Sequence, residues 1–215
     1  MGDEGNSASY YFAMNQTGLL PREELLEVGK KQKSMSFGVP FEREEGENRI
    51  PLTPQGVELL VANGHKIVIE SGAGNAANYY DHDFSEAGAQ IVNNHEDPFR
   101  CDVVLKVAPP DKEERQLLSP GQLLISLLHL VKQDRNSIQQ LMHRKVNALA
   151  YEFLKDESEC FPVVRSMSEI EGYTAIMIAS EYLSKVKDGK GVLLGGITGI
   201  SPAEVVVIGA GTAGE

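Results

Sequence analysis

The stretch VVVIGAGTAGE (205–215) joins a run of β-forming residues to a run of glycines. Residues 205–208 are apolar and β-branched, which is typical of a buried strand in a parallel sheet. The next six residues, Gly209, Ala210, Gly211, Thr212, Ala213 and Gly214, have the spacing G-x-G-x-x-G. After a strand, this spacing predicts the turn that receives the pyrophosphate of a dinucleotide. An ordinary strand–helix turn is the alternative, because glycines mark any tight turn.

A dinucleotide turn should open a helix whose N-terminus binds the phosphates, but the sequence stops at Glu215. The acidic residue that binds the ribose is expected about 20 residues beyond the glycines, outside this sequence. These residues therefore do not distinguish NAD from NADP, and we expect NAD without excluding NADP. We expect a fragment of a longer protein, with incomplete cofactor binding and little or no turnover of its own.

Strand and helix patterns alternate before this stretch. Apolar runs predict strands at 36–40, 65–71, 89–94, 102–108, 122–130 and 146–154. Helical patterns follow at 53–64, before Gly88, at 134–145 and at 167–186. Such alternation implies parallel pairing through right-handed crossovers. The sequence thus predicts an α/β, doubly wound, Rossmann-like substrate domain, followed by the start of a second, truncated Rossmann dinucleotide-binding domain.

We divide the chain into three parts. Residues 1–34 form an N-terminal extension, partly flexible, with a helical pattern at 17–33. Residues 35–163 form the substrate (catalytic) domain. Residues 164–215 supply a linking helix and the first strand and glycine-rich turn of an incomplete NAD(P)-binding domain.

Composition excludes several classes of protein. The net charge of −11 argues against nucleic acid or an anionic membrane surface as the partner. Cys101 and Cys160 have neither a metal spacing nor a disulfide pattern, which suits a reducing compartment. The apolar runs are too short to span a bilayer, and the N-terminus lacks the order of a secretory signal. The sequence therefore predicts a cytoplasmic protein with no metal and no membrane insertion.

Three residues near predicted strand ends are candidates for chemistry. Arg49 follows the first strand, where a guanidinium can bind a carboxylate; a solvated arginine among glutamates is the alternative. Lys106 interrupts the apolar run VVLKVAPP and, being costly to bury unpaired, should face a polar cavity. His129 ends the run LLISLLHL, where a hydrogen-bonded core histidine is the plainer reading.

Together these residues suit the chemistry of a 2-oxo or 2-amino acid. Arg49 would bind the carboxylate, Lys106 would polarise the C2 oxygen and His129 would move a proton. A nicotinamide would supply the redox partner. Spacing alone does not show that the three meet in space.

The residues also carry a resemblance to a known family. ENRIPLTPQGVELLVANGH (47–65), DVVLKVAPP (102–110), MSEI (167–170) and GISPAEVVVIGAGTAGE (199–215) resemble alanine dehydrogenase and the alpha subunit of nicotinamide nucleotide transhydrogenase. The resemblance implies that Arg49 and Lys106 bind the substrate, that His129 is catalytic, and that Met167 forms a wall of the substrate pocket. It also implies a homo-oligomer acting on alanine and pyruvate.

Two branches of this family are open to the chain. The transhydrogenase branch lacks the histidine of the LHL motif, so His129 favours alanine dehydrogenase. Leu127 stands where alanine dehydrogenases commonly have tyrosine, and Gly172-Tyr173 is closer to the transhydrogenase pattern. The alternatives are a transhydrogenase alpha subunit and a non-catalytic module that binds a small acid or another subunit.

Overall fold

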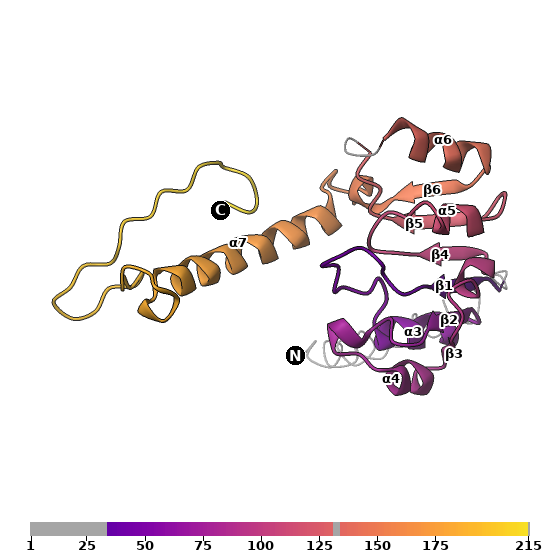
Figure 1. Ribbon diagram of the computed structural model, residues 1–215, viewed down its shortest axis with the longest axis horizontal. Helices are drawn as coiled ribbons and strands as arrows, with labels where there is room; N and C mark the ends of the chain where they lie inside the picture. The colour runs from indigo at the N-terminus through magenta and orange to yellow at the C-terminus, as the bar shows by residue number, and fades with distance from the viewer. Residues whose placement is uncertain (1–33, 131–133, 215) are drawn as a thin grey trace, which may run out of the picture. The chain divides into compact units, whose positions relative to one another are not determined.

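The computed structural model describes residues 34–130 and 134–214 (Figure 1). The helical extension expected at 17–33 lies outside the described residues. The strands are β1 (Ser36–Val39), β2 (Lys66–Glu70), β3 (Gln90–Val92), β4 (Val103–Leu105), β5 (Leu123–Ser126) and β6 (Asn147–Ala150). The α-helices are α3 (Pro54–Ala62), α4 (Asp81–Glu86), α5 (Glu114–Leu117), α6 (Arg135–His143) and α7 (Pro162–Leu183). Short 3₁₀ turns are η1 (Asn75–Ala77), η2 (Pro98–Arg100), η3 (Tyr151–Phe153) and η4 (Lys185–Lys187).

The sheet of the described chain has the strand order β3-β2-β1-β4-β5-β6. The pairs β1–β2, β1–β4, β2–β3 and β5–β6 are parallel. Strands are added outward from β1 on one side and from β4 on the other, which places a topological switch point between these two strands. The predicted doubly wound α/β fold is confirmed.

The described chain forms two compact units. One contains residues 34–42 and 48–105, with strands β1 to β4, and the other contains residues 43–47 and 106–214, with β5, β6 and α7. The domain boundaries expected after residues 34 and 163 stay a prediction.

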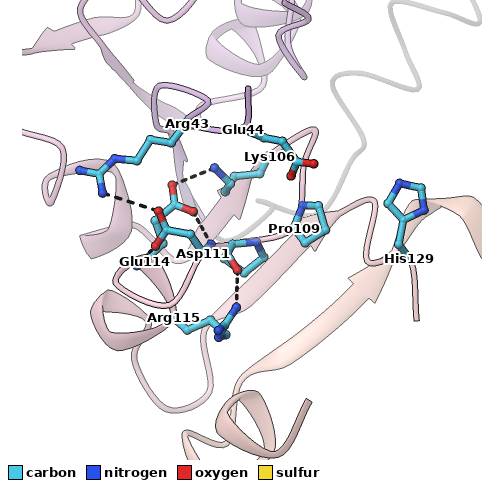
Figure 2. A pocket seen from close by; sticks show the side chains of 9 residues that line it. Arg43, Glu44, Lys106, Pro109, Asp111, Glu114, Arg115 and His129 are labelled. Carbon is cyan, nitrogen blue, oxygen red and sulfur yellow. Dashed lines mark hydrogen bonds and ion pairs between the residues drawn. The ribbon is translucent and has the colours of Figure 1, made fainter. Parts of the chain in front are cut away.

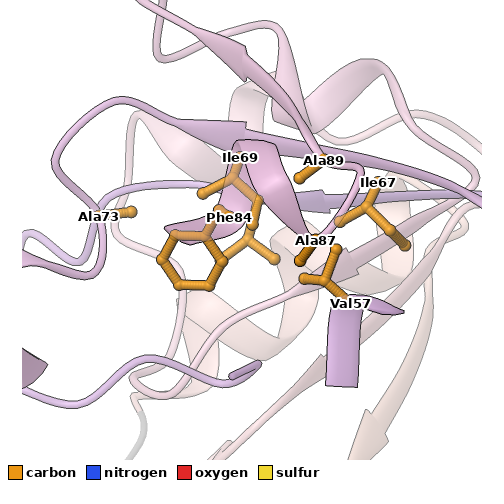
Figure 3. Close-up of a cluster of buried hydrophobic side chains, with 8 residues drawn as sticks. Val57, Ile67, Ile69, Ala73, Phe84, Ala87 and Ala89 are labelled. Atoms are coloured by element: carbon orange, nitrogen blue, oxygen red, sulfur yellow. The ribbon is translucent and has the colours of Figure 1, made fainter. Parts of the chain in front are cut away.

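The first unit has a dry core around β2 (Figure 3). Ile67, Val68 and Ile69 are all buried, as expected for a parallel strand covered on both faces. Val57 of α3 and Phe84 of α4 are also buried and belong to the same cluster as Ile67 and Ile69. Burial of apolar surface stabilises a fold by roughly 25 cal/mol per Å². This core therefore stabilises the strands that carry the loops described below.

One glycine lets the chain cover the sheet closely. A Cβ built on Gly38 of β1 would overlap the carbonyl oxygen of Pro98 in η2. The backbone of η2 therefore lies directly on β1, and Phe99 of the same turn is buried. Only glycine leaves room for this contact.

Two helices begin where the sequence predicts. The side chain of Thr53 accepts a hydrogen bond from the Gly56 N–H and caps α3, whose first residue is Pro54. The side chain of Asp134 accepts from the Ser137 N–H and caps α6 in the same way. The strand after each helix consequently starts close to its expected position.

The structure corrects two expectations about the last part of the chain. Helix α7 begins at Pro162, five residues before the predicted start at Met167, because proline is favoured in the first helical turn. Residues 205–208, expected to form a buried strand, form no strand, and Ile208 is 97% exposed. A strand requires hydrogen bonds from a neighbouring strand, and none in the described chain pairs with these residues. No helix within the described residues combines the length and apolar character needed to cross a membrane.

Candidate active site

A pocket of about 370 Å³ lies in the second unit (Figure 2). Several charged residues and two prolines line it: Arg43, Glu44, Lys106, Pro109, Pro110, Asp111, Glu114, Arg115 and His129. Lys106 directly follows β4, and His129 lies three residues after the end of β5. The loops beyond the carboxyl ends of parallel strands are where open α/β sheets bind ligands.

Lys106 is a buried cation on the wall of this pocket. Its side chain is 1% exposed, and its Nζ atom lies 2.8 Å from Oε1 of Glu114, whose side chain is also 1% exposed. The Lys106 N–H donates to the carbonyl oxygen of Ile125, so the lysine backbone continues the sheet ladder beyond β4. The expectation that Lys106 faces a polar cavity agrees with this geometry.

A tight acidic turn presents Glu114 to the lysine. Asp111 Oδ1 accepts hydrogen bonds from the N–H groups of Glu113 (2.7 Å) and Glu114 (2.8 Å). In return, the Asp111 N–H donates to Glu114 Oε2 at 2.8 Å. These reciprocal bonds fix the first turn of α5, so both oxygens of the Glu114 carboxylate are held.

The surroundings of Asp111 lower the pKa of its carboxyl group. Partial burial acts to raise its pKa, but the N–H groups of Glu114 and Glu113 and the positive charges of Arg43 and Lys106 outweigh burial, so the pKa of Asp111 lies below its usual value. The Arg43 guanidinium lies 3.6 Å from Asp111 Oδ2 and 3.1 Å from Glu113 Oε2. These contacts thus favour the ionised form of the Asp111 carboxyl.

Arg115 connects the residues before this turn to helix α6. Its guanidinium donates to the Pro110 carbonyl oxygen at 2.7 Å and to Gln140 Oε1 on α6 at 2.8 Å. Through these two bonds the Pro109-Pro110 segment is tied to α6, which gives the pocket a firm wall.

His129 is held through its backbone. It is exposed, and its φ of 47° lies in the left-handed region. The N–H groups of Leu128 and His129 both donate to the carboxylate of Glu152 in η3, at 3.3 and 2.9 Å. In Figure 2 the imidazole stands apart from the ion pair, beyond Pro109. His129 is therefore not the buried core histidine that was the alternative.

The 3₁₀ turn η3 also contacts the loop of the lysine. The Tyr151 hydroxyl donates to the Val107 carbonyl oxygen at 2.9 Å, next to Lys106. Glu152 binds the loop after β5 from the same turn. Adjacent residues of η3 thus tie down both loops that carry candidate residues.

Two further candidates are not among the residues that line this pocket. Arg49 is exposed, follows β1 and belongs to the first unit. The segment before Arg49 begins at Phe41. The Phe41 N–H donates to Glu70 Oε2 at 2.7 Å, and His95 Nδ1 lies 2.7 Å from the same oxygen. Met167 is half-buried on α7 and is not among the residues that line the pocket. The structure brings together Lys106 and His129.

The glycine-rich turn is compact but lacks its flanking elements. A Cβ built on Gly214 would lie 2.9 Å from the Gly209 carbonyl oxygen, and one on Gly172 of α7 would lie 2.6 Å from that of Ala213. Such close backbone approach suits a phosphate-binding turn. Within the described residues, 205–208 form no strand before this turn. Dinucleotide binding by residues 209–214 stays a prediction.

The two carboxylates that contact Lys106 and the His129 backbone have no motif that reveals them. Glu114 lies eight positions after Lys106 in a charged segment with other acids, and Glu152 follows a different strand. The one available signal is chemical, because a lysine inside an apolar run requires a buried carboxylate. That signal predicts a partner without selecting it.

The sheet order defines a doubly wound α/β protein, and a pocket lies beyond the ends of β4 and β5. Residues 38–171 match the family model described as "Alanine dehydrogenase/PNT, N-terminal domain", and residues 175–215 match "Alanine dehydrogenase/PNT, C-terminal domain". The chain belongs to the alanine dehydrogenase/PNT family.

Individual relatives agree with this family. The alanine dehydrogenase of Methanococcus maripaludis is 40% identical over 181 residues, which cover 84% of this chain and 48% of that protein. That of Staphylococcus saprophyticus is 39% identical over 180 residues, with the same coverage of 84% and 48%. The chain thus spans about half the length of the curated relatives it matches.

Solved structures show the same relation. An L-alanine dehydrogenase is similar with a TM-score of 0.79 and 37% identity, covering 84% of this chain and 50% of that one. A transhydrogenase from Sinorhizobium meliloti is similar with a TM-score of 0.63 and 22% identity, covering 68% and 44%. The second likeness shows a shared fold.

Proposed function

We propose that the chain is the N-terminal part of an alanine dehydrogenase, which converts L-alanine, NAD⁺ and water reversibly into pyruvate, ammonium, NADH and a proton. The observation that carries this proposal is the shared pocket of Lys106 and His129. A fixed lysine and an imidazole that line one pocket match the needs of a 2-oxo acid. Relatives named alanine dehydrogenase are about 40% identical.

Each residue has a defined task in this proposal. The Lys106 ammonium group donates a hydrogen bond to the C2 oxygen of pyruvate and so polarises the carbonyl. His129 accepts or returns the proton of the attacking water or amine as the substrate carbon changes between sp² and sp³. Arg49 binds the carboxylate, and Met167 packs against the substrate. When bound, the nicotinamide supplies the hydride acceptor.

The cofactor and the cellular setting belong to the same proposal. The turn from Gly209 to Gly214 binds the dinucleotide, with NAD preferred and NADP as the alternative. The protein acts in the cytoplasm as a homo-oligomer.

The decisive assay follows absorbance of the reduced nicotinamide in the protein as its gene encodes it, with pyruvate, ammonium and NADH. We expect consumption that requires ammonium. Since general acid–base catalysis contributes roughly 10²–10⁴-fold, His129→Ala should lower kcat/KM at least about 100-fold. Lys106→Ala should lower it comparably, and Arg49→Ala should chiefly raise the KM for pyruvate. The exposed Lys112→Ala and His143→Ala serve as matched controls.

A second candidate is the alpha subunit of a transhydrogenase, favoured by Gly172-Tyr173. Hydride transfer between two nucleotides needs no imidazole in a small-acid pocket. Activity between NADH and an NADP analogue, unchanged in His129→Ala and independent of ammonium, would replace the first proposal with this one. Pyruvate binding without turnover would indicate a non-catalytic small-acid module.

A further inference from the structure

Glu152 of η3 is not among the residues that line the pocket, yet it binds the segment that carries His129. Its Oε2 atom accepts the Leu128 N–H at 3.3 Å, and its Oε1 atom accepts the His129 N–H at 2.9 Å. One carboxylate thus binds two successive amides of the backbone. Successive N–H groups that converge in a turn form a small anion site, and here the anion is a side chain of the protein itself.

The sheet brings Glu152 and His129 to the same edge. Ser126, the last residue of β5, pairs with Ala150, the last residue of β6. Neighbouring parallel strands that end in register leave the sheet side by side. Glu152 lies two positions beyond the end of β6, and His129 lies three positions beyond the end of β5. The contact between them therefore follows from the register of the two strands.

The backbone at His129 needs an anchor of this kind. Its φ of 47° lies in the left-handed region, which residues other than glycine rarely adopt. Such a residue keeps this conformation only where its surroundings fix it, and such positions cluster at functional sites. The His129 side chain is exposed, whereas Leu128 before it is buried. The two hydrogen bonds to Glu152 act directly on this backbone and supply the anchor.

The turn η3 is itself held at the edge of the sheet. The Tyr151 hydroxyl donates to the Val107 carbonyl oxygen at 2.9 Å, and the Leu127 N–H donates to the same oxygen at 3.1 Å. The Leu154 N–H closes the turn on the Tyr151 carbonyl oxygen at 3.2 Å. A carboxylate on such a turn has a defined position before any ligand binds.

We infer that Glu152 is a positioning residue for His129: its carboxylate holds the left-handed backbone and thereby directs the imidazole at the pocket. The direction of the Cα–Cβ bond depends on φ, so a return to negative φ would turn the imidazole away from the place that it has in Figure 2. The inference rests on the proposed function for the proton transfer assigned to His129. Glu152 acts through the histidine and not on the substrate.

The first test is a double-variant cycle on the reduction of pyruvate by NADH and ammonium, in the protein as its gene encodes it. Glu152→Gln keeps the size of the side chain but replaces one acceptor oxygen by a donor that opposes an N–H. We expect kcat to fall about tenfold with the KM for pyruvate little changed, because a catalytic group misplaced by about 1 Å can cost roughly 100-fold. In His129→Ala, the same substitution should have little further effect on kcat.

Two results of this cycle would overturn the inference. If Glu152→Gln lowers kcat by the same factor with and without the imidazole, the carboxylate supports the fold and does not position His129. An unchanged kcat in Glu152→Gln would show that the imidazole needs no such support. Glu157→Gln makes the same substitution at an exposed residue of the following loop and should behave as wild type.

Crystal structures of wild type and Glu152→Gln test the inference without any substrate. We expect His129 to leave the left-handed region in the variant and its imidazole to change direction, while β5 and β6 keep their register. The same φ and the same imidazole direction in both crystals would overturn the inference. A wild type that does not turn over pyruvate would refute the proposed function, and the two crystal structures would still decide whether Glu152 sets the conformation of His129.

Discussion

Lys106 and His129 line one pocket, yet the chain holds them in opposite ways. The lysine is fixed through its side chain, which is buried and bound to Glu114. The histidine is fixed through its backbone, which donates to Glu152, while its imidazole remains exposed. A cation that polarises a carbonyl is most effective when it is oriented in advance. An imidazole that exchanges protons needs access to water and substrate. The contrast therefore matches the different tasks proposed for the two residues.

The largest effect is expected from removing the buried cation. Lys106→Ala takes away a partner from a buried ion pair and should lower the free energy of unfolding by about 3–5 kcal/mol. His129→Ala alters an exposed side chain and should change it by less than about 0.5 kcal/mol. Urea unfolding followed by circular dichroism measures both, with exposed Lys112→Ala as the control. If both variants lost the same free energy of unfolding, the conclusion that Lys106 is fixed through its side chain and His129 through its backbone would be wrong.

A smaller effect is expected from Glu152, whose carboxylate accepts hydrogen bonds from the backbone of Leu128 and His129. Glu152→Gln replaces a charged acceptor of two backbone N–H groups by a neutral one, and should lower the free energy of unfolding by about 1.5 kcal/mol. The amides of Leu128 and His129 should then exchange with solvent faster, while those of β5 do not. Hydrogen exchange read by NMR tests this, and exposed Glu157→Gln is the matched control. Unchanged exchange at both amides would show that Glu152 does not hold the loop.

These two residues also show how far sequence reasoning reaches. Lys106 was identifiable because a charge inside an apolar run needs a polar partner. Its partner was not identifiable, because Asp111, Glu113 and Glu114 lie close together in the sequence. The partner is Glu114 because Asp111 accepts hydrogen bonds from the Glu113 and Glu114 N–H groups, and this turn directs the Glu114 side chain towards the lysine. The exposure of His129 was also missed, since an apolar run ending in histidine reads as a strand, whereas β5 ends at Ser126.

Local propensity failed most clearly at residues 205–208. These residues and the buried strand β2 are both rich in β-branched side chains, but β2 lies between β1 and β3. Residues 205–208 have no neighbouring strand in the described chain and remain exposed. Helix α3 and the alternation of strands and helices along the chain were predictable because caps and periodicity are local. The order of the strands in the sheet was not, because pairing depends on which strand lies alongside.

The smallest effect concerns the turn that presents Glu114. The pKa of Asp111 is lowered in the folded protein, so its ionised form stabilises the fold above the unfolded-state pKa of about 3.9, and this stabilisation is lost as pH falls through the lower folded-state value. The side chain is 42% exposed, so solvent screening limits the effect to less than about 1 kcal/mol. Asp111→Asn should therefore be less stable than wild type at neutral pH, and the two should converge in acid. Urea unfolding at a series of pH values measures this, with Glu113→Gln as the control. A difference that persists unchanged in acid would assign the role of Asp111 to hydrogen bonding alone, and the acidic turn would then orient Glu114 without contributing charge to the lysine side of the pocket.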